Sequence, residues 1–193
     1  MILGKNKKRK GFTIAELMVS IFIIFLIAGI FLTGYQSSGK KSRLKMTAQN
    51  LASDIRKAQG FALGLKEFSD TGETPLGGWG IYLSNVNELN NYYDIYADHT
   101  EDHIYQEANE NFERINFEGG IYVKEIIFYD HLDNPYSQTQ AHITFEPPDP
   151  VIYFCDQNSC INNYVLVEII LTDRSGDTKR VVVNKFGLVD VED

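Results

Sequence analysis

The stretch that decides the fold of this chain reads Gly11-Phe12-Thr13-Ile14-Ala15-Glu16-Leu17-Met18-Val19-Ser20-Ile21-Phe22-Ile23-Ile24-Phe25-Leu26-Ile27-Ala28-Gly29-Ile30-Phe31-Leu32. No charged side chain occurs from residue 17 to residue 39, a run of 23 residues. As an α-helix such a run is about 35 Å long, which exceeds the roughly 30 Å hydrocarbon core of a bilayer. We therefore predict a membrane-spanning helix near the N-terminal end.

One acidic residue, Glu16, lies at the start of this apolar run. An ionisable side chain in a membrane segment is costly, which predicts a functional role for it. The alternative is a carboxylate that merely extends to the lipid headgroups. Small residues at 34–38 also leave open cleavage of the run as an ordinary secretory signal.

The residues around Glu16 resemble the class III signal of type IV pilins and type II secretion pseudopilins. Five basic side chains precede Gly11, Phe12 follows it, and Glu16 lies five positions after the glycine. The resemblance implies that residues 1–11 are a leader, removed between Gly11 and Phe12 by a separate prepilin peptidase, and that the new Phe12 amine is methylated. It also implies that Glu16 of one subunit pairs with the Phe12 amine of a neighbour, since each charge alone is costly in an apolar bundle.

Charge is distributed unevenly along the chain, whose net charge is −8. Residues 1–10 carry five basic side chains, residues 40–66 carry seven basic side chains and one acidic one, and residues 67–193 carry 24 acidic and six basic ones. The basic leader predicts a cytoplasmic N-terminus, and the basic segment after the apolar run suits contact with anionic lipid. The acidic remainder disfavours nucleic-acid binding, which normally needs a basic patch.

Residues 40–66 continue the helix with an amphipathic pattern. Apolar side chains recur every three or four positions, which places them on one helix face. They are Leu44, Ala48, Leu51, Ile55, Ala58, Ala62 and Leu65. Because no proline interrupts residues 12–66, we predict one long helix. Its first half, residues 12–39, would cross the membrane, and its second half, residues 40–66, would dock on a folded head.

Residues 67–193 are predicted to form a β-rich head outside the cytoplasm. Short runs rich in Val, Ile, Tyr and Phe alternate there with turn residues, as is typical of strands. The predicted strands are Trp79–Leu83, Tyr92–Tyr96, Ile121–Tyr129, His142–Phe145, Val151–Phe154, Tyr164–Leu171, Thr178–Val183 and Leu188–Val191. The run from Asp173 to Asp177 predicts a hairpin turn between two of them.

The order of elements resembles the GspH/FimT-type minor pilins. The runs that carry the resemblance are Gly77-Gly78-Trp79-Gly80-Ile81-Tyr82-Leu83, Tyr93-Asp94-Ile95-Tyr96-Ala97-Asp98 and Lys179-Arg180-Val181-Val182-Val183-Asn184-Lys185-Phe186-Gly187-Leu188-Val189. The resemblance implies an α+β fold in which the helix packs on two antiparallel sheets arranged like a sandwich. Some members of that group bind DNA through basic residues at the C-terminal glycine turn. The corresponding residues here, 187–193, are acidic, which disfavours DNA binding.

Two pairs of residues in the head are candidate metal ligands. An acidic stretch contains Asp94, Asp98, Glu101, Asp102, Glu107 and Glu110. It is either a solvated acidic loop or, through Asp98 and Asp102, a weak calcium site, and it lacks the glycine that a calcium loop uses at its sharp turn. His99 and His103 are four residues apart and could share a zinc ion on a helix, but the metalloprotease pattern is absent. Exposed loop histidines are the alternative.

The two cysteines, Cys155 and Cys160, enclose four residues. If the head lies outside the cytoplasm, a disulfide between them is expected, and free thiols are the alternative. Two cysteines without a second pair do not predict a metal site.

No nucleophile elbow, phosphate-binding glycine loop or zinc knuckle occurs in the sequence, so we predict neither catalysis nor a cofactor. We expect a minor pilin or pseudopilin that is held in the cytoplasmic membrane by one span and then enters a filament. Its partners would be membrane lipid, the prepilin peptidase and other pilin subunits. The alternatives are a DNA-uptake or adhesive tip subunit, and a membrane-anchored enzyme or sensor that never assembles.

Overall fold

The structure, a computed structural model, describes residues 11–68, 72–148, 151–157, 160 and 164–192. The side chains of residues 31–38 and 40 lie outside this description. The predicted leader, apart from Gly11, also lies outside the described residues. The chain divides into two compact units, Met1–Lys40 and Lys41–Asp193.

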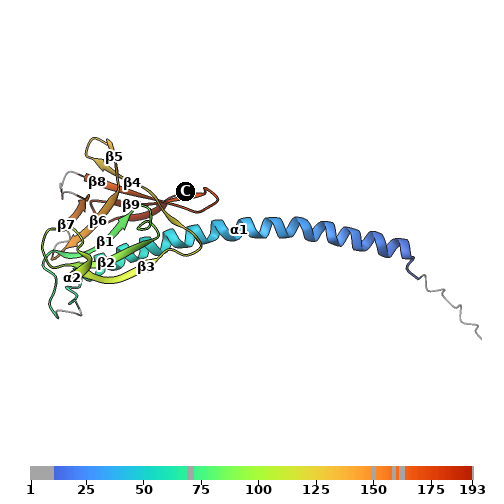
Figure 1. Ribbon diagram of the computed structural model, residues 1–193, viewed down its shortest axis with the longest axis horizontal. Coiled ribbons are helices and arrows are strands. Elements are labelled where there is room, and N and C mark those ends of the chain that lie inside the picture. Colours follow the sequence, from blue (N-terminus) through green and yellow to red (C-terminus); the bar gives the residue numbers. More distant parts are fainter. Residues whose placement is uncertain (1–10, 69–71, 149–150, 158–159, 161–163, 193) are drawn as a thin grey trace, which may run out of the picture. The chain divides into compact units, whose positions relative to one another are not determined.

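A single long helix, α1 (Ile14–Leu63), belongs partly to each unit (Figure 1). The prediction of one helix from residue 12 to residue 66 is confirmed, with an N-terminal end two residues later and a C-terminal end three residues earlier. The absence of proline leaves every backbone N–H of this segment free to continue the helical hydrogen bonds.

None of the helices in the described part of the chain combines the length and the mean hydropathy needed to cross a membrane. The predicted span, residues 12–39, falls partly on residues 31–38, whose side chains are not described. The prediction of a transmembrane half is therefore not confirmed.

The second half of α1 is buried along one face within the second unit. The buried side chains are Leu44, Ala48, Leu51, Ala52, Ile55, Ala58 and Ala62, each at most 1% exposed. Four of these are alanines, which let the helix backbone approach the strands closely. The Phe61 ring meets the ring of Trp79 edge-on, with centroids 5.0 Å apart. The predicted apolar face is thus confirmed at every position except Leu65.

Leu65 lies beyond the end of α1 and outside the core. Its backbone is left-handed, with φ at 49°, and the Lys66 N–H donates to the Phe61 carbonyl at 2.9 Å. This is the Schellman pattern that ends many helices. Because the chain changes direction here, the Leu65 side chain is 53% exposed. Its predicted place on the buried face is wrong.

The described residues form ten strands in two antiparallel sheets. Sheet A has the order β3-β2-β1-β6-β7, and sheet B has the order β10-β9-β8-β4-β5 (Figure 1). Sheet A consists of β1 (Gly78–Ser84), β2 (Tyr92–Asp98), β3 (Asn111–Asn116), β6 (Gln140–Glu146) and β7 (Val151–Cys155). Sheet B consists of β4 (Tyr122–Asp130), β5 (Pro135–Gln138), β8 (Tyr164–Thr172), β9 (Thr178–Asn184) and β10 (Val189–Glu192). A short helix, α2 (Glu107–Glu110), precedes β3.

All eight predicted strands are confirmed to within two residues at each end. The predicted hairpin turn between β8 and β9 is also confirmed, since the Gly176 N–H donates to the Asp173 carbonyl at 3.1 Å. Strands β3 and β5 were not predicted. Strand β5 begins with Pro135 and is mostly exposed, and β3 carries charged residues at its centre. Edge strands of this kind lack the apolar alternation that identifies a strand in a sequence.

The two sheets and the second half of α1 share one apolar core, which confirms an α+β head with two antiparallel sheets. Trp79 of β1 is fully buried there, and its Nε1–H donates to the Lys66 carbonyl at 3.1 Å. Gly80 of β1 faces the opposite side of sheet A, where a Cβ would overlap the ring of Tyr96. Glycine at position 80 therefore leaves room for the Tyr96 ring on that side of the sheet.

Candidate functional site

The predicted processing position lies in an accessible, irregular segment. Gly11, Phe12 and Thr13 precede α1 and have no regular secondary structure. All three are exposed, and the Phe12 side chain is 84% exposed. A peptidase could therefore reach the bond between Gly11 and Phe12 without unwinding the helix. Cleavage itself stays a prediction.

Glu16 takes part in capping the first turn of α1. The Glu16 N–H donates to the Thr13 hydroxyl oxygen, and the Thr13 N–H donates to the Glu16 carboxylate, both at 3.3 Å. This reciprocal pair is a capping box, and it satisfies two N–H groups that a helix end otherwise leaves without partners. A negative charge in the first turn also interacts favourably with the helix dipole. Glu16 therefore already has a local partner within its own chain.

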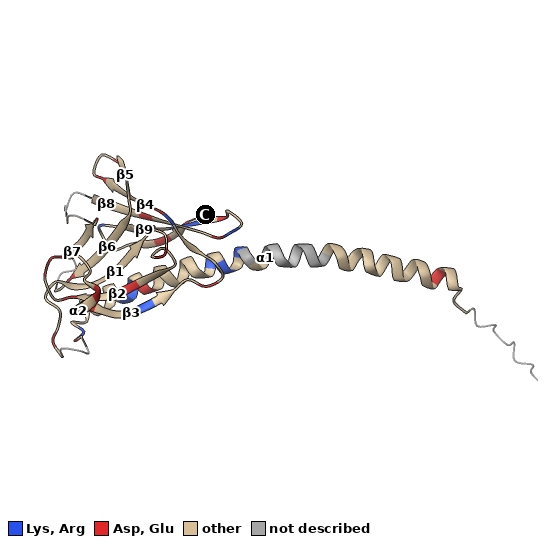
Figure 2. Cartoon of the chain, in the orientation of Figure 1, with Lys and Arg blue, Asp and Glu red and all other residues tan. Residues whose placement is uncertain are grey.

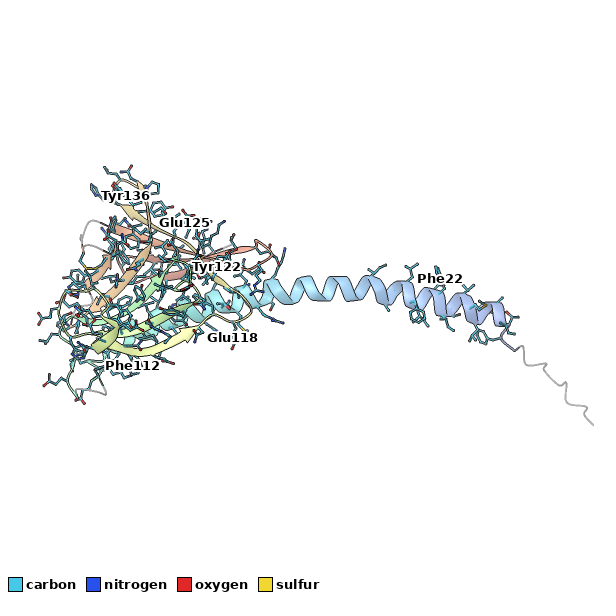
Figure 3. The ribbon with its side chains drawn as sticks, in the orientation of Figure 1. Phe22, Phe112, Glu118, Tyr122, Glu125 and Tyr136 are labelled. Carbon is cyan, nitrogen blue, oxygen red and sulfur yellow. A yellow bond between two sulfur atoms is a disulfide. The ribbon has the colours of Figure 1, made fainter. Side chains whose placement is uncertain are left out.

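The surface of α1 after Glu16 is apolar on all sides. Among its large side chains up to residue 30, the exposed fraction runs from 45% at Ile21 to 73% at Phe25. Phe22 and its neighbours project outward around the helix (Figure 3). Glu16 is the one charged side chain between residues 14 and 30, and Figure 2 shows red near the N-terminal end of α1. Exposed apolar surface of this extent indicates a site that contacts a partner or a membrane.

A family model for the prokaryotic N-terminal methylation motif matches residues 6–32. This match supports the type IV pilin and pseudopilin family for the chain. The match includes the processing position, Glu16 and most of the apolar run, and it ends before the head. The likeness of the head to the GspH/FimT group therefore stays a prediction. Neither the curated proteins nor the solved structures contain a match to the chain.

In the head of this pilin-like chain, the acidic stretch from Asp94 in β2 to Glu110 before β3 is partly buried. Asp94, Asp98 and Glu110 are each 0% exposed. The prediction of a solvated acidic loop is wrong for these three residues. Asp98 and Glu110 are buried because a strap, defined as residues 99–110, folds back over the outer face of sheet A and supplies hydrogen-bond donors to them. The donors to Asp94 are Arg114 and Asn111 of β3.

The calcium candidate gains no support from this geometry. The Asp98 carboxylate accepts the backbone N–H groups of Thr100, Glu101 and His103 at 3.1, 2.8 and 2.8 Å. Asp102 likewise accepts N–H donors from within the strap. Both carboxylates therefore serve to close the loop. Within the described ranges, no group of three or more His, Cys, Asp or Glu residues could hold a metal ion.

The prediction of exposed loop histidines is wrong for His99 and His103, because both are partly buried. The His99 ring packs on Phe68 with centroids 5.0 Å apart, and the His103 ring stacks on Tyr153 at 3.8 Å. The two rings thus pack against different elements, an arrangement that does not favour a shared zinc ion.

Two buried polar contacts of the head were not predicted from the sequence. Arg114 binds both oxygens of Asp94 through Nε and Nη2, at 2.8 and 2.9 Å, and this pairing raises the pKa of Arg114. His142 accepts the Tyr105 N–H through Nδ1 at 2.9 Å, and burial lowers the pKa of His142 to about 4. Asp94 and Arg114 lie opposite each other in the register of β2 and β3. Recognition of β3 would have revealed this pair.

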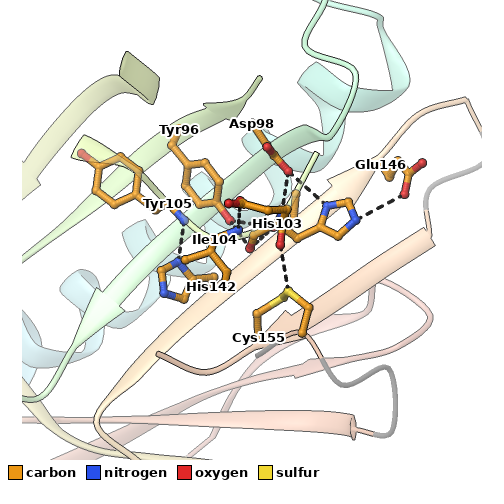
Figure 4. The surroundings of a disulfide bond; sticks show 11 residues. Tyr96, Asp98, His103, Ile104, Tyr105, His142, Glu146 and Cys155 are labelled. Atoms are coloured by element: carbon orange, nitrogen blue, oxygen red, sulfur yellow. Dashed lines mark hydrogen bonds and ion pairs between the residues drawn. A yellow bond between two sulfur atoms is a disulfide. The ribbon is translucent and has the colours of Figure 1, made fainter. Parts of the chain in front are cut away.

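Cys155, at the end of β7, is joined to Cys160 by a disulfide bond (Figure 4). Cys155 is buried, and the sulfur of Cys160 lies 3.3 Å from the Asp102 carbonyl oxygen. The bridge therefore lies against the strap. Residues 158–159, between the two cysteines, are outside the described residues. Formation of the bond in the cell stays a prediction.

The turn between β9 and β10 contains the glycine at which some GspH/FimT-type minor pilins place basic residues for DNA binding, and where this sequence is acidic. Gly187 has a φ of 80°, which suits glycine, and Phe186 beside it is 82% exposed. Arg56 of α1 donates to the Val189 carbonyl at 2.6 Å and holds the strand that follows the turn. The Arg56 guanidinium is thereby engaged within the head, which leaves it less free to contact a phosphate.

Proposed function

We propose that the chain is a minor pilin or pseudopilin of the GspH/FimT type, a structural subunit of a filament. The observation that carries this proposal is the arrangement at residues 11–16. An accessible Gly11–Phe12 bond precedes a helix whose first turn contains Glu16, and an exposed apolar surface follows. The methylation-motif match over residues 6–32 and the two-sheet head support the proposal.

In the proposed mechanism the precursor is held in the cytoplasmic membrane by residues 12–39, with its head outside the cytoplasm. The capping box keeps the Glu16 carboxylate hydrogen-bonded before assembly. Cleavage then creates a positive amine on Phe12, two residues before the first helical residue. A positive charge near a helix N-terminus opposes the helix dipole. A carboxylate from a second subunit compensates this amine, which favours one register of docking.

The head contributes contacts at the surface of the filament, and it needs no catalytic site in this role. We therefore expect its partners to be other subunits, the prepilin peptidase and, before assembly, membrane lipid. The alternative of a DNA-uptake or adhesive tip subunit shares the same N-terminal segment. A gel-shift assay with the full chain in detergent micelles separates the two: we expect no retardation of DNA at low salt, and retardation that weakens with salt would favour the alternative.

The processing step is tested by coexpression of the chain with a prepilin peptidase. We expect the unchanged chain to lose residues 1–11 and the Gly11→Val variant to keep them, because a branched side chain at the cleaved bond hinders access. Gly29→Ala is the matched control, since a Cβ there meets no neighbouring atom. Removal of the leader from the Gly11→Val variant at the normal rate would contradict this assignment.

The assembly role is tested by two substitutions in the capping box. Glu16→Ala removes the charge and the hydrogen bond that the carboxylate accepts from the Thr13 N–H, whereas Thr13→Ala removes the hydrogen bond that the hydroxyl accepts from the Glu16 N–H and keeps the charge. We expect Glu16→Ala to abolish incorporation into filaments and Thr13→Ala to leave most of it, as measured by immunoblots of sheared filaments. Equal losses in both variants would show that helix capping, and not pairing with a neighbour's amine, is the function of Glu16.

A further inference from the structure

The strap, residues 99–110, is attached to the outer face of sheet A mainly by polar groups. The Tyr105 ring packs on Tyr82 and Tyr96, with centroids 5.1 and 5.2 Å away. Its N–H donates to His142, and the Tyr96 hydroxyl donates to the His103 carbonyl at 3.3 Å. Because these contacts are polar, the attachment of the strap depends on the protonation state of the groups that it contacts.

Asp98 is the anchor of the strap. It is fully buried, and three backbone N–H groups of the strap donate to its carboxylate. A buried carboxylate also needs compensation of its charge. Within the described residues, the cationic side chain placed to provide this is His103, whose Nδ1 lies 3.1 Å from the Asp98 Oδ2 atom.

The His103 ring is bracketed by two carboxylates. On its other side, Nε2 lies 3.7 Å from an oxygen of Glu146, at the end of β6 (Figure 4). The ring also stacks on Tyr153 of β7, with centroids 3.8 Å apart and planes 16° from parallel. A protonated ring in this position joins the strap to strands β2 and β6 at the same time, whereas a neutral ring can donate to only one of the two carboxylates.

We propose that His103 is a proton-operated latch: the protonated ring holds the strap on sheet A, and loss of that proton loosens the strap from the tyrosine-rich face beneath it. The latch acts within the head and is independent of the N-terminal processing. The groups that face His103 are Asp98, Glu146, Tyr153 and the backbone of Gly77, and Thr144 contacts its carbonyl oxygen.

The direction of the latch follows from these surroundings. Burial lowers the pKa of His103, but the hydrogen bond and charge of Asp98 and the charge of Glu146 outweigh it, and the pKa of His103 is raised above 6.5. A raised pKa in the folded state means that the stabilisation is fully present below about pH 6.5. It is lost as pH rises through the raised value. The strap is therefore closed in mild acid and loosens in alkali.

His142, which lies in β6 beneath the strap, titrates at lower pH. Burial lowers the pKa of His142 to about 4, so His142 is neutral above pH 6 and remains an acceptor for the Tyr105 N–H. Asp102 and Asp156 are the charges that act on His142. Burial raises the pKa of Glu110, and Asp98 is the charged group that acts on it. A change in the strap between pH 6 and pH 9 that depends on His103 is thus distinct from the titration of His142.

The latch is tested by hydrogen exchange of the full chain in detergent micelles between pH 6 and pH 9. Exchange rates of the His103 and Tyr105 amides, divided by their intrinsic rates, should rise with pH, by about tenfold for each unit by which the pKa of His103 is raised. The His103→Gln variant should exchange faster at pH 6 and lose the pH dependence. His131→Gln is the control, because His131 is exposed on the loop after β4.

A second variant covers the case in which His103→Gln does not fold. Glu146→Gln alters a side chain that is 36% exposed, and it should lower the midpoint of the His103 ring titration, followed by NMR. Strap exchange should then begin to rise at a lower pH. Strap exchange that is independent of pH, or a pH dependence that persists in His103→Gln, would overturn the latch, as would a His103 midpoint at or below 6.5.

Discussion

The two halves of α1 are parts of one helix with opposite surroundings. From Ile14 to Ile30 the large apolar side chains are exposed, whereas from Leu44 to Ala62 one face is at most 1% exposed. The first half is made of large side chains on all sides, and the second half places alanine and leucine on a single face with charged residues elsewhere. Both halves form the same continuous α-helix. The difference in burial between them therefore comes from their side chains.

This difference shows which part of the helix has its apolar side chains buried by other residues of the same chain. The second half has its partners in sheets A and B, and its burial contributes to the stability of the head. The first half has a large apolar surface, and water is an unfavourable environment for that surface. We infer that its partners lie outside the chain, in lipid before assembly and in other subunits afterwards.

The largest expected effect comes from shortening one isoleucine in each half of α1. Ile55→Ala leaves a cavity in the core and should lower the free energy of unfolding of the head by about 2–5 kcal/mol. Ile24→Ala removes as many atoms from an exposed site and should change that free energy by less than about 0.5 kcal/mol. Urea titration of the full chain in micelles, followed by the fluorescence of Trp79, measures both. Similar losses in the two variants would refute the contrast.

The second prediction uses pH, to which the head should respond. Because burial lowers the pKa of His142 from 6.5 to about 4, the head is most stable above about pH 6.5 as far as this group is concerned. Stability should fall by up to about 3 kcal/mol as pH falls toward 4. Urea midpoints at several pH values test this. The loss of stability in acid should be smaller in His142→Gln than in the unsubstituted chain, and it should be the same in His131→Gln as in the unsubstituted chain. A full loss in His142→Gln would show that other groups cause it.

The third prediction concerns the disulfide of the head. Cys155 and Cys160 close a short loop, and the chain-entropy account gives such a loop about 2 kcal/mol of stabilisation. Cys160→Ala should therefore lower the free energy of unfolding by about this amount, and reductant should do the same to the unchanged chain but not to the variant. The unchanged chain can also be isolated from the extracytoplasmic side and treated with a thiol reagent before any reduction. Reaction of its cysteines with the reagent would contradict both the disulfide and the expected compartment.

A smaller effect is expected where the second half of α1 makes a polar contact with sheet A. The Tyr93 hydroxyl donates to Asp54 at 2.5 Å, and burial raises the pKa of Tyr93 well above its ordinary value. Tyr93→Phe should cost about 1 kcal/mol, because a partly buried acceptor loses its donor. Urea titration measures this loss, and Asp54→Asn, which keeps an acceptor, should cost less.

Much of this fold could be predicted because apolar periodicity is strong where the elements meet the core. The buried face of α1 and eight strands follow from it. The outer face of sheet A could not be predicted, because Asp98 and Glu110 look solvated until the strap supplies their N–H partners. Arg114 likewise gains its role only from the register of β2 and β3.

The N-terminal site differs in this respect, since its residues are adjacent in sequence. Gly11, Phe12 and Glu16 identify it from the sequence alone, and the motif match includes all three. The capping box between Thr13 and Glu16 is the feature that the structure adds. Short-range sites are readable in this way, whereas sites assembled from distant strands are not.

The most direct test of the account is the mass of the N-terminal peptide of the mature protein, isolated from cells that contain a prepilin peptidase. We predict a peptide that begins at Phe12 and carries a methyl group on its amine. A mature protein that retains residues 1–11, or one that begins within residues 34–38, would contradict the assignment of Glu16 as the partner of a neighbour's Phe12 amine.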